Sequence, residues 1–181
     1  MGNGLQVIVQ IEIFFFGQCE VFIGTGNLFA PVSIAGADKC TDSSQCEHCL
    51  LYTSYSPLTL AYIGDCIYDL VIKSLVLYKG NKPVHAMHEE TSKYVQASAQ
   101  SQMMRKMQEY LTEEEHAVYR RGRNTRSVSA AKNQSITDYR RATGFEALLG
   151  YLYLKKEWKR LLELVKIGLD SLEEQTLYER K

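Results

Sequence analysis

The chain has 181 residues and a mass of 20.6 kDa, which fits one domain with a short appendage. Hydrophobic residues make up 45% and charged residues 23%, so the composition excludes a collagen-like, wholly disordered or disulfide-scaffold protein. The 21 basic and 21 acidic side chains give a net charge of zero, so total charge indicates neither a nucleic-acid nor a membrane partner. No run of about 18 apolar residues occurs, so we expect no membrane-spanning helix and no membrane partner.

The first 49 residues differ in pattern from the rest of the chain. Apolar and polar residues alternate from Leu5 to Phe15, which predicts a strand, and residues 20–23 could form a second one. Residues 24–49 are rich in Gly, Ser, Asp and Cys and are predicted to be a loop. A two-stranded hairpin alone is marginal in water. We therefore predict an N-terminal extension over 1–49 that is either a docked β-hairpin or disordered, and a further hypothesis is that it is not a native domain.

The chain has five cysteines, most of them in this extension. An odd number, with no basic residue ahead of the N-terminal apolar stretch, predicts reduced thiols in a cytoplasmic protein. Cys40, Cys46, His48 and Cys49 could together bind zinc. A second Cys-x-x-Cys pair is absent, however, so free thiols are favoured over a zinc site.

From Pro57 onward the apolar spacing is helical, which predicts an all-α domain over residues 50–181. Thr112 and Glu115 have the spacing of a capping box, and Ser135 or Thr137 could cap the helix after a polar loop at 123–136. The five predicted helices cover residues 58–78, 84–110, 112–122, 137–155 and 157–174.

Acidic residues occur inside two of the most apolar predicted helices. Asp65 and Asp69 are the only charged residues between positions 58 and 72, and Glu146 is the only one between 142 and 154. Both stretches are apolar nearly all round, which predicts buried helices. A buried carboxylate is costly unless it is paired, protonated, hydrogen-bonded or bound to a metal. These acids therefore require a structural or a functional explanation.

Two interpretations of these acids differ in the partner that they assign. Asp65 and Glu146 could form structural salt bridges with arginines, or they could share a site for a hard cation such as Mg²⁺, which prefers oxygen ligands. Few basic residues lie near them in sequence, which favours the cation site. Gly64 and Gly150 would let the two helices approach closely and so bring the acids together.

Positive charge is concentrated in residues 120–141, where seven basic residues and one acid, Asp138, give a net charge of +6. Arg, Lys, Ser and Asn side chains of this kind contact phosphates in nucleic-acid complexes. Taken alone, the segment could be merely a solvated surface. A basic segment beside a carboxylate-bound cation is, however, suited to hydrolysis of a phosphodiester, because the cation activates water and stabilises developing charge.

Three motifs resemble those of Mini-ribonuclease III, the short branch of the ribonuclease III family that lacks a separate double-stranded-RNA-binding domain. They are LAYIGDCIY at 60–68, RRGRN at 120–124, and Tyr139 followed by TGFEALLGYLYL at 143–154. Their order and spacing match that family over about residues 56–170. The resemblance implies an all-α ribonuclease III-like endonuclease domain that acts as a homodimer.

The resemblance further implies a Mg²⁺-dependent endoribonuclease that cleaves double-stranded RNA and is linked in bacteria to maturation of large-subunit ribosomal RNA. By position, Asp65 and Glu146 are the expected catalytic and metal-binding carboxylates. The residues expected to bind RNA are Arg121, Arg123, Asn124, Arg126, Lys132, Asn133 and Arg140.

This chain departs from the wider ribonuclease III pattern at three positions. Leu58, Ala61 and Thr143 stand where that pattern has further acids, as they do in the short branch, so the number of bound metal ions stays open. Two alternatives to the enzyme are a non-catalytic relative that binds double-stranded RNA and a helical protein-interaction domain.

Overall fold

The computed structural model describes residues 55–125 and 135–179, which all belong to one unit of the chain, Leu51–Lys181. The predicted N-terminal extension, with its candidate zinc ligands, lies outside the described residues. So do residues 126–134 of the predicted loop. The predicted domain boundary near residue 50 stays a prediction.

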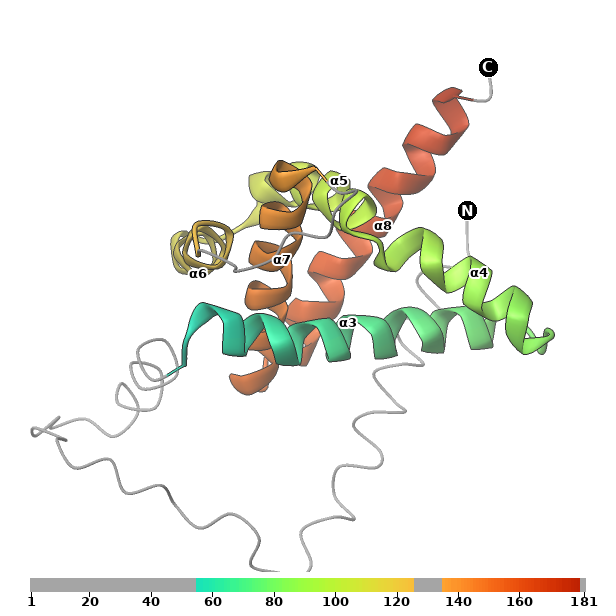
Figure 1. Cartoon of the computed structure of the whole chain (residues 1–181), viewed down its shortest axis with the longest axis horizontal. Coiled ribbons are helices and arrows are strands. Elements are labelled where there is room, and N and C mark those ends of the chain that lie inside the picture. Colours follow the sequence, from blue (N-terminus) through green and yellow to red (C-terminus); the bar gives the residue numbers. More distant parts are fainter. Residues whose placement is uncertain (1–54, 126–134, 180–181) are drawn as a thin grey trace, which may run out of the picture. The chain divides into compact units, whose positions relative to one another are not determined.

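All regular structure in the described residues is helical, as predicted (Figure 1). No helix in residues 55–125 or 135–179 is long and apolar enough to cross a bilayer. The α-helices are α3 (Pro57–Tyr78), α4 (Val84–Val95), α5 (Ala97–Met107), α6 (Glu113–Arg123), α7 (Ile136–Leu154) and α8 (Trp158–Glu179), and a short 3₁₀ helix, η1, covers Gln108–Tyr110.

The prediction of one continuous helix over 84–110 is wrong, because the backbone at Gln96 is extended, with a ψ of 145°. The break separates α4, which packs on α3, from α5, which packs on α7 and α8. The Tyr68 hydroxyl donates a 3.1 Å hydrogen bond to the Tyr94 carbonyl, in the last turn of α4 where carbonyls lack helical partners. The two parts of the predicted helix, α4 and α5, therefore pack on different neighbours.

The predicted capping box at the start of α6 is confirmed. Thr112 Oγ1 accepts a hydrogen bond from the Glu115 amide (3.2 Å), and Glu115 Oε2 accepts one from the Thr112 amide (2.8 Å). Arg160 of α8 donates to the same carboxylate (Nε to Oε1, 2.8 Å) and to the Tyr110 carbonyl (2.6 Å). The cap thus also joins α6, η1 and α8.

The central helix is α7, which packs against α3, α5, α6 and α8 and crosses α3 steeply (Figure 1). Glycines make the crossing with α3 possible. A Cβ atom added at Gly64 would overlap the carbonyl oxygen of Glu146, and one added at Gly150 would overlap that of Leu60. The two backbones therefore touch, which is the close approach that the small residues predict.

The prediction that both acid-bearing helices are buried all round holds for most of residues 142–154 of α7 but not for α3. One side of α3 is exposed although it carries large apolar side chains: Tyr62 is 75% exposed, and Leu58, Leu70 and Leu77 are exposed as well. These residues, referred to below as the α3 stripe, follow the spacing of one helix face. An apolar sequence cannot distinguish a helix buried in its own chain from one that presents a face to a partner.

Candidate functional site

Asp65 and Glu146 are brought together by the crossing of α3 and α7. Gly64 packs directly on the backbone of Glu146, and Asp65 is the next residue of α3. The prediction that Asp65 is buried is wrong. Asp65 is exposed because it lies toward the open side of α3. Glu146 is largely enclosed on α7, so the two acids meet at the edge of the helical core.

The pKa values of both acids are raised, and the charge of Asp65 contributes to the rise at Glu146. Burial, and then the nearby charge of Asp65, raise the pKa of Glu146 to about 8, while the Gln100 side chain opposes this rise. Partial desolvation and the charge of Asp69 raise the pKa of Asp65, and Lys73 acts against them. Each carboxylate therefore resists ionisation in the fold, which makes the pair receptive to added positive charge.

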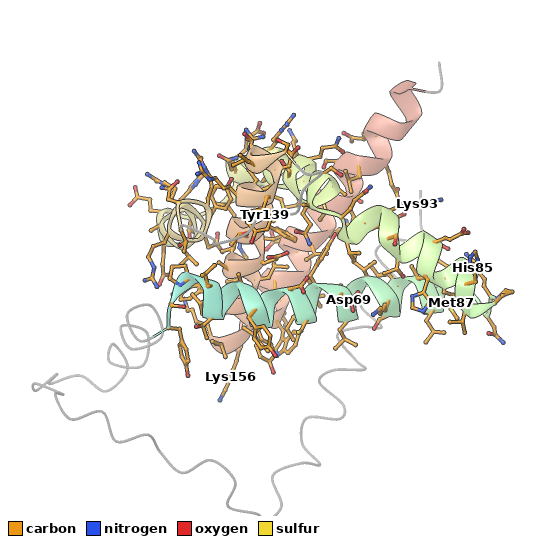
Figure 2. All side chains as sticks on the ribbon, viewed as in Figure 1. Asp69, His85, Met87, Lys93, Tyr139 and Lys156 are labelled. Carbon is orange, nitrogen blue, oxygen red and sulfur yellow. The ribbon has the colours of Figure 1, made fainter. Side chains whose placement is uncertain are left out.

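The structural salt-bridge interpretation finds no support in the described residues. No basic side chain of 55–125 or 135–174 forms an ion pair with Asp65 or Glu146. Asp69, by contrast, is one turn further along α3 (Figure 2) and pairs with Lys73, with 2.5 Å between Nζ and Oδ2. Of Asp65, Asp69 and Glu146, Asp69 is thus the one with an ordinary surface partner.

The donor set of Asp65 and Glu146 fits a hard divalent cation. Carboxylate oxygens are the ligands that Mg²⁺ prefers, and it commonly binds through one or two of them while keeping several waters. No group of three or more His, Cys, Asp or Glu side chains gathers within the described part of the chain. A cation at this pair would therefore fill its other positions with water or substrate oxygens.

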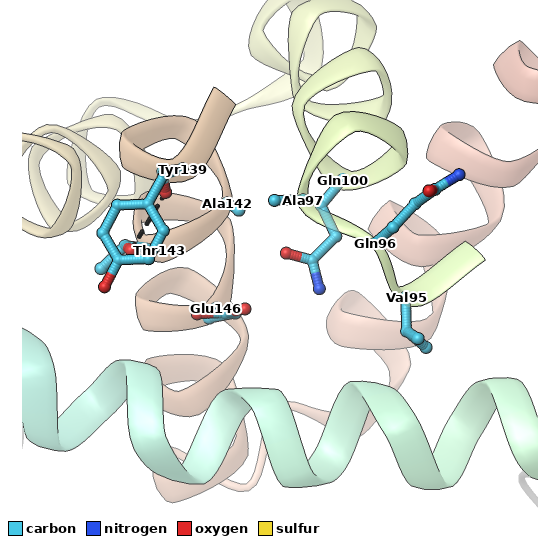
Figure 3. Close-up of a pocket in the computed structure, with 8 residues that line it drawn as sticks. All are labelled: Val95, Gln96, Ala97, Gln100, Tyr139, Ala142, Thr143 and Glu146. Atoms are coloured by element: carbon cyan, nitrogen blue, oxygen red, sulfur yellow. Dashed lines mark hydrogen bonds between the residues drawn. The ribbon is translucent and has the colours of Figure 1, made fainter. Parts of the chain in front are cut away.

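A pocket of about 230 Å³ adjoins Glu146 between α5 and α7 (Figure 3). Gln100 of α5 reaches into it opposite Glu146, and Tyr139 and Thr143 of α7 line another part of it. Gln100 could not be predicted from the sequence, since a lone glutamine on a helix has no distinctive pattern. The full lining consists of Val95, Gln96, Ala97, Gln100, Tyr139, Ala142, Thr143 and Glu146.

Four of the seven residues predicted to bind RNA fall in the described part of the chain. Arg123 and Asn124 are exposed at the end of α6, and Arg140 is exposed near the start of α7. Arg121 is only partly exposed and donates a 2.7 Å hydrogen bond to the Tyr55 carbonyl. The other three, Arg126, Lys132 and Asn133, lie outside the described residues.

Asp138, the single acid of the basic segment, has partners that the sequence did not reveal. It accepts a 2.6 Å hydrogen bond from the buried Ser101 hydroxyl of α5. Arg105 of α5 and Arg141 of α7 each lie 4.0 Å from its carboxylate. The packing of α5 on α7 therefore places Arg105 beside the basic segment. There Arg105 and Arg141 offset the negative charge of Asp138.

The helical fold, with an acidic pair beside a basic segment, corresponds to a ribonuclease III-type nuclease. The profile of the Ribonuclease III domain matches residues 58–157. This match includes Asp65, Glu146 and the whole basic segment, residues 120–141.

Individual relatives define the family more narrowly. Mini-ribonuclease 3 of Clostridium tetani is 48% identical over 120 residues, covering 66% of this chain and 80% of the relative. That of a Thermoanaerobacter species is 46% identical over 121 residues, covering 67% and 85%. A crystal structure of a Fusobacterium nucleatum protein matches with a TM-score of 0.62 and 27% identity, covering 66% of this chain and 98% of that one. The chain belongs to the Mini-ribonuclease 3 family and is an endoribonuclease.

The raised pKa of Glu146 predicts a pH-dependent effect of Glu146→Gln on stability. In the unfolded chain a glutamate ionises near pH 4.3, whereas in the fold the pKa is about 8. The metal-free protein therefore loses stability as the pH rises between these values, because the unfolded state releases its proton first. Glutamine does not titrate, so the variant should gain on the order of 3 kcal/mol over the wild type at pH 8 and much less at pH 5.

This prediction is checked by urea unfolding in EDTA at both pH values. Glu173→Gln, which changes an exposed glutamate of α8, is the matched control and should show no such gain. An equal stability difference between the wild type and Glu146→Gln at pH 5 and pH 8 would contradict the assignment.

Proposed function

We propose that this endoribonuclease cleaves double-stranded RNA and that Asp65 and Glu146 are its catalytic carboxylates, which hold Mg²⁺. One observation carries the proposal. Direct backbone contact between α3 and α7 places two acids near each other, and neither acid pairs with a described basic side chain. Bound Mg²⁺ supplies an activated water and stabilises the charge that develops on the phosphate. Asp65 and Glu146 orient that ion at the edge of the core.

The basic segment is proposed as the surface that holds the RNA. Exposed Arg123, Asn124 and Arg140 can donate to phosphate and sugar oxygens, and Arg126, Lys132 and Asn133 are proposed to do the same. A duplex of A-form RNA is recognised mainly by its shape, its phosphates and its 2′-hydroxyls. A basic helical surface is therefore sufficient for binding without a separate RNA-binding domain.

The natural substrate that we propose is the precursor of large-subunit ribosomal RNA, processed in the cytoplasm. The support is the resemblance of the three sequence motifs to those of the family. Arg and Asn side chains on phosphates select little sequence, so the choice of natural duplex must depend on RNA shape.

The α3 stripe supports a homodimer. Its four large apolar side chains are exposed on the helix that carries Asp65. Exposed apolar patches of this kind mark interaction surfaces, and a self-complementary face that meets itself across a two-fold axis closes after two copies. We propose that a second copy of this chain covers the stripe.

Loss of either proposed catalytic acid should abolish cleavage. Asp65→Asn and Glu146→Gln should each lower the rate on a long RNA duplex with Mg²⁺ by at least about 100-fold, since each removes charge that the transition state requires. Circular dichroism and duplex binding should stay near wild type. Asp69→Asn, which alters the neighbouring acid that pairs with Lys73, is the matched control and should retain most of the activity.

Two results would argue against this assignment. Unfolding of both variants would favour a structural role of the acids, and duplex binding by a wild-type protein that never cleaves would favour the non-catalytic RNA-binding relative.

Removal of exposed arginines should reduce the salt dependence of duplex binding. Each phosphate contact contributes about 0.9 to the slope of log K against log salt for duplex DNA, and a similar value is expected for RNA. The double variant Arg123→Ala/Arg140→Ala should therefore lower the slope by up to about 2. Lys159→Ala, at an exposed lysine of α8, is the control. An unchanged slope in the arginine variant would remove these two residues from the interface.

A charge placed in the α3 stripe should separate the proposed dimer. Tyr62→Lys puts an ammonium at the most exposed position of the stripe, so sedimentation should show a monomer where the wild type shows a dimer. Ile136→Lys adds the same charge at another exposed apolar residue, at the start of α7, and should stay dimeric. A dimer that tolerates Tyr62→Lys would show that the stripe is not the interface.

A further inference from the structure

The Gln100 side chain is a buried polar group that lacks one hydrogen-bond partner among the described residues. Its residue is only 1% exposed, and its Oε1 atom accepts no hydrogen bond from any described residue. Buried polar atoms in folded proteins nearly always have a partner. An acceptor without one therefore indicates a ligand or water that occupies the adjoining space.

That space is the pocket beside Glu146. Figure 3 shows the Gln100 amide group projecting from α5 into the pocket, with Glu146 facing it from α7. Gln96, Tyr139 and Thr143 also contribute side-chain oxygens to the lining, and the Thr143 hydroxyl donates a 3.1 Å hydrogen bond to the Tyr139 carbonyl of its own helix. Thr143 is thus engaged within α7, whereas the Gln100 amide group projects from α5 toward Glu146.

The polar groups that face each other across this pocket define what it can bind. A carboxylate and an amide oxygen both accept hydrogen bonds, and no described basic side chain pairs with Glu146. Gln100 also has an amide nitrogen, a hydrogen-bond donor on the same group that faces Glu146 across the pocket. A hydrated divalent cation matches this arrangement, because it brings positive charge and its waters are strong hydrogen-bond donors.

We propose that Gln100 is a positioning residue of the acidic site, whose amide nitrogen orients the Glu146 carboxylate and whose Oε1 accepts a hydrogen bond from the water shell of the bound cation. The proposal rests on the function proposed above, since it assumes a cation at Asp65 and Glu146. Groups of this kind hold carboxylate ligands in place, and their loss commonly weakens metal affinity by about 10- to 100-fold.

The test measures Mn²⁺ binding to the full chain without RNA, by the electron paramagnetic resonance signal of the free ion. Gln100→Met keeps the length of the side chain but removes both polar atoms. It should weaken Mn²⁺ binding by about 10- to 100-fold without lowering the melting temperature of the metal-free protein. Gln102→Met makes the same change at an exposed position of α5 and should bind Mn²⁺ like the wild type.

The results for the two acid variants distinguish a failure of this proposal from a failure of the proposed function. If Asp65→Asn and Glu146→Gln lose Mn²⁺ while Gln100→Met binds it normally, the acidic site stands and the role of Gln100 is refuted. A lower melting temperature of Gln100→Met, with unchanged affinity in the folded fraction, would make Gln100 a purely structural residue. If wild-type binding is absent, or is unaffected by both acid variants, the cation site and the role of Gln100 are both refuted.

Discussion

The contact on which the rest of the site depends is that between the backbones of α3 and α7. Gly64 lies against the carbonyl of Glu146, and Gly150 lies against that of Leu60. Any side chain at either glycine would force the helices apart by the width of a methyl group or more. Asp65 follows Gly64 directly, so the distance between the two acids is set by main-chain packing rather than by flexible side chains. A site for a small ion would gain from this, because side chains that start from fixed backbone positions need less further ordering.

This arrangement lowers stability locally, and the surrounding core offsets the loss. Burial, and then the neighbouring charge of Asp65, make ionisation of Glu146 unfavourable and raise its pKa, and no described basic side chain pairs with it. An unpaired charge in the interior can cost several kcal/mol. Around it, α7 buries most of its side chains, and Phe145 packs edge-to-face on Tyr68 with 5.0 Å between ring centroids. The residues on either side of Glu146 thus serve packing, whereas Glu146 is the residue of this stretch that packing does not explain and that we propose to bind the cation.

Local sequence patterns predicted the features that depend on one helix at a time. The capping box of Thr112 and Glu115 and the ends of α3 and α7 follow from rules within a single turn. The break at Gln96 could not be predicted, because it results from α4 and α5 packing on different neighbours. The exposure of Asp65 was missed for a related reason, since apolar composition does not show which side of α3 faces its own chain. Gln100 and the Arg105–Asp138 contact join residues of α5 and α7, and sequence spacing carries no information about such pairs.

The distribution of charge is compatible with the proposal that a chain of zero net charge binds both a cation and a polyanion. At physiological ionic strength charges separated by more than about 8 Å are largely screened, so local rather than total charge decides binding. The acidic pair alone would repel a phosphate. A divalent cation bound there would offset the charge of the two carboxylates, so the phosphate would meet the ion and the basic segment and not the bare acids. Asp138 would weaken that segment, but Arg105 and Arg141 flank its carboxylate and the Ser101 hydroxyl occupies one of its oxygens. In the proposed mechanism the cation would therefore serve the attraction of the scissile phosphate as well as its chemistry, whereas the basic segment could hold the rest of the duplex without it.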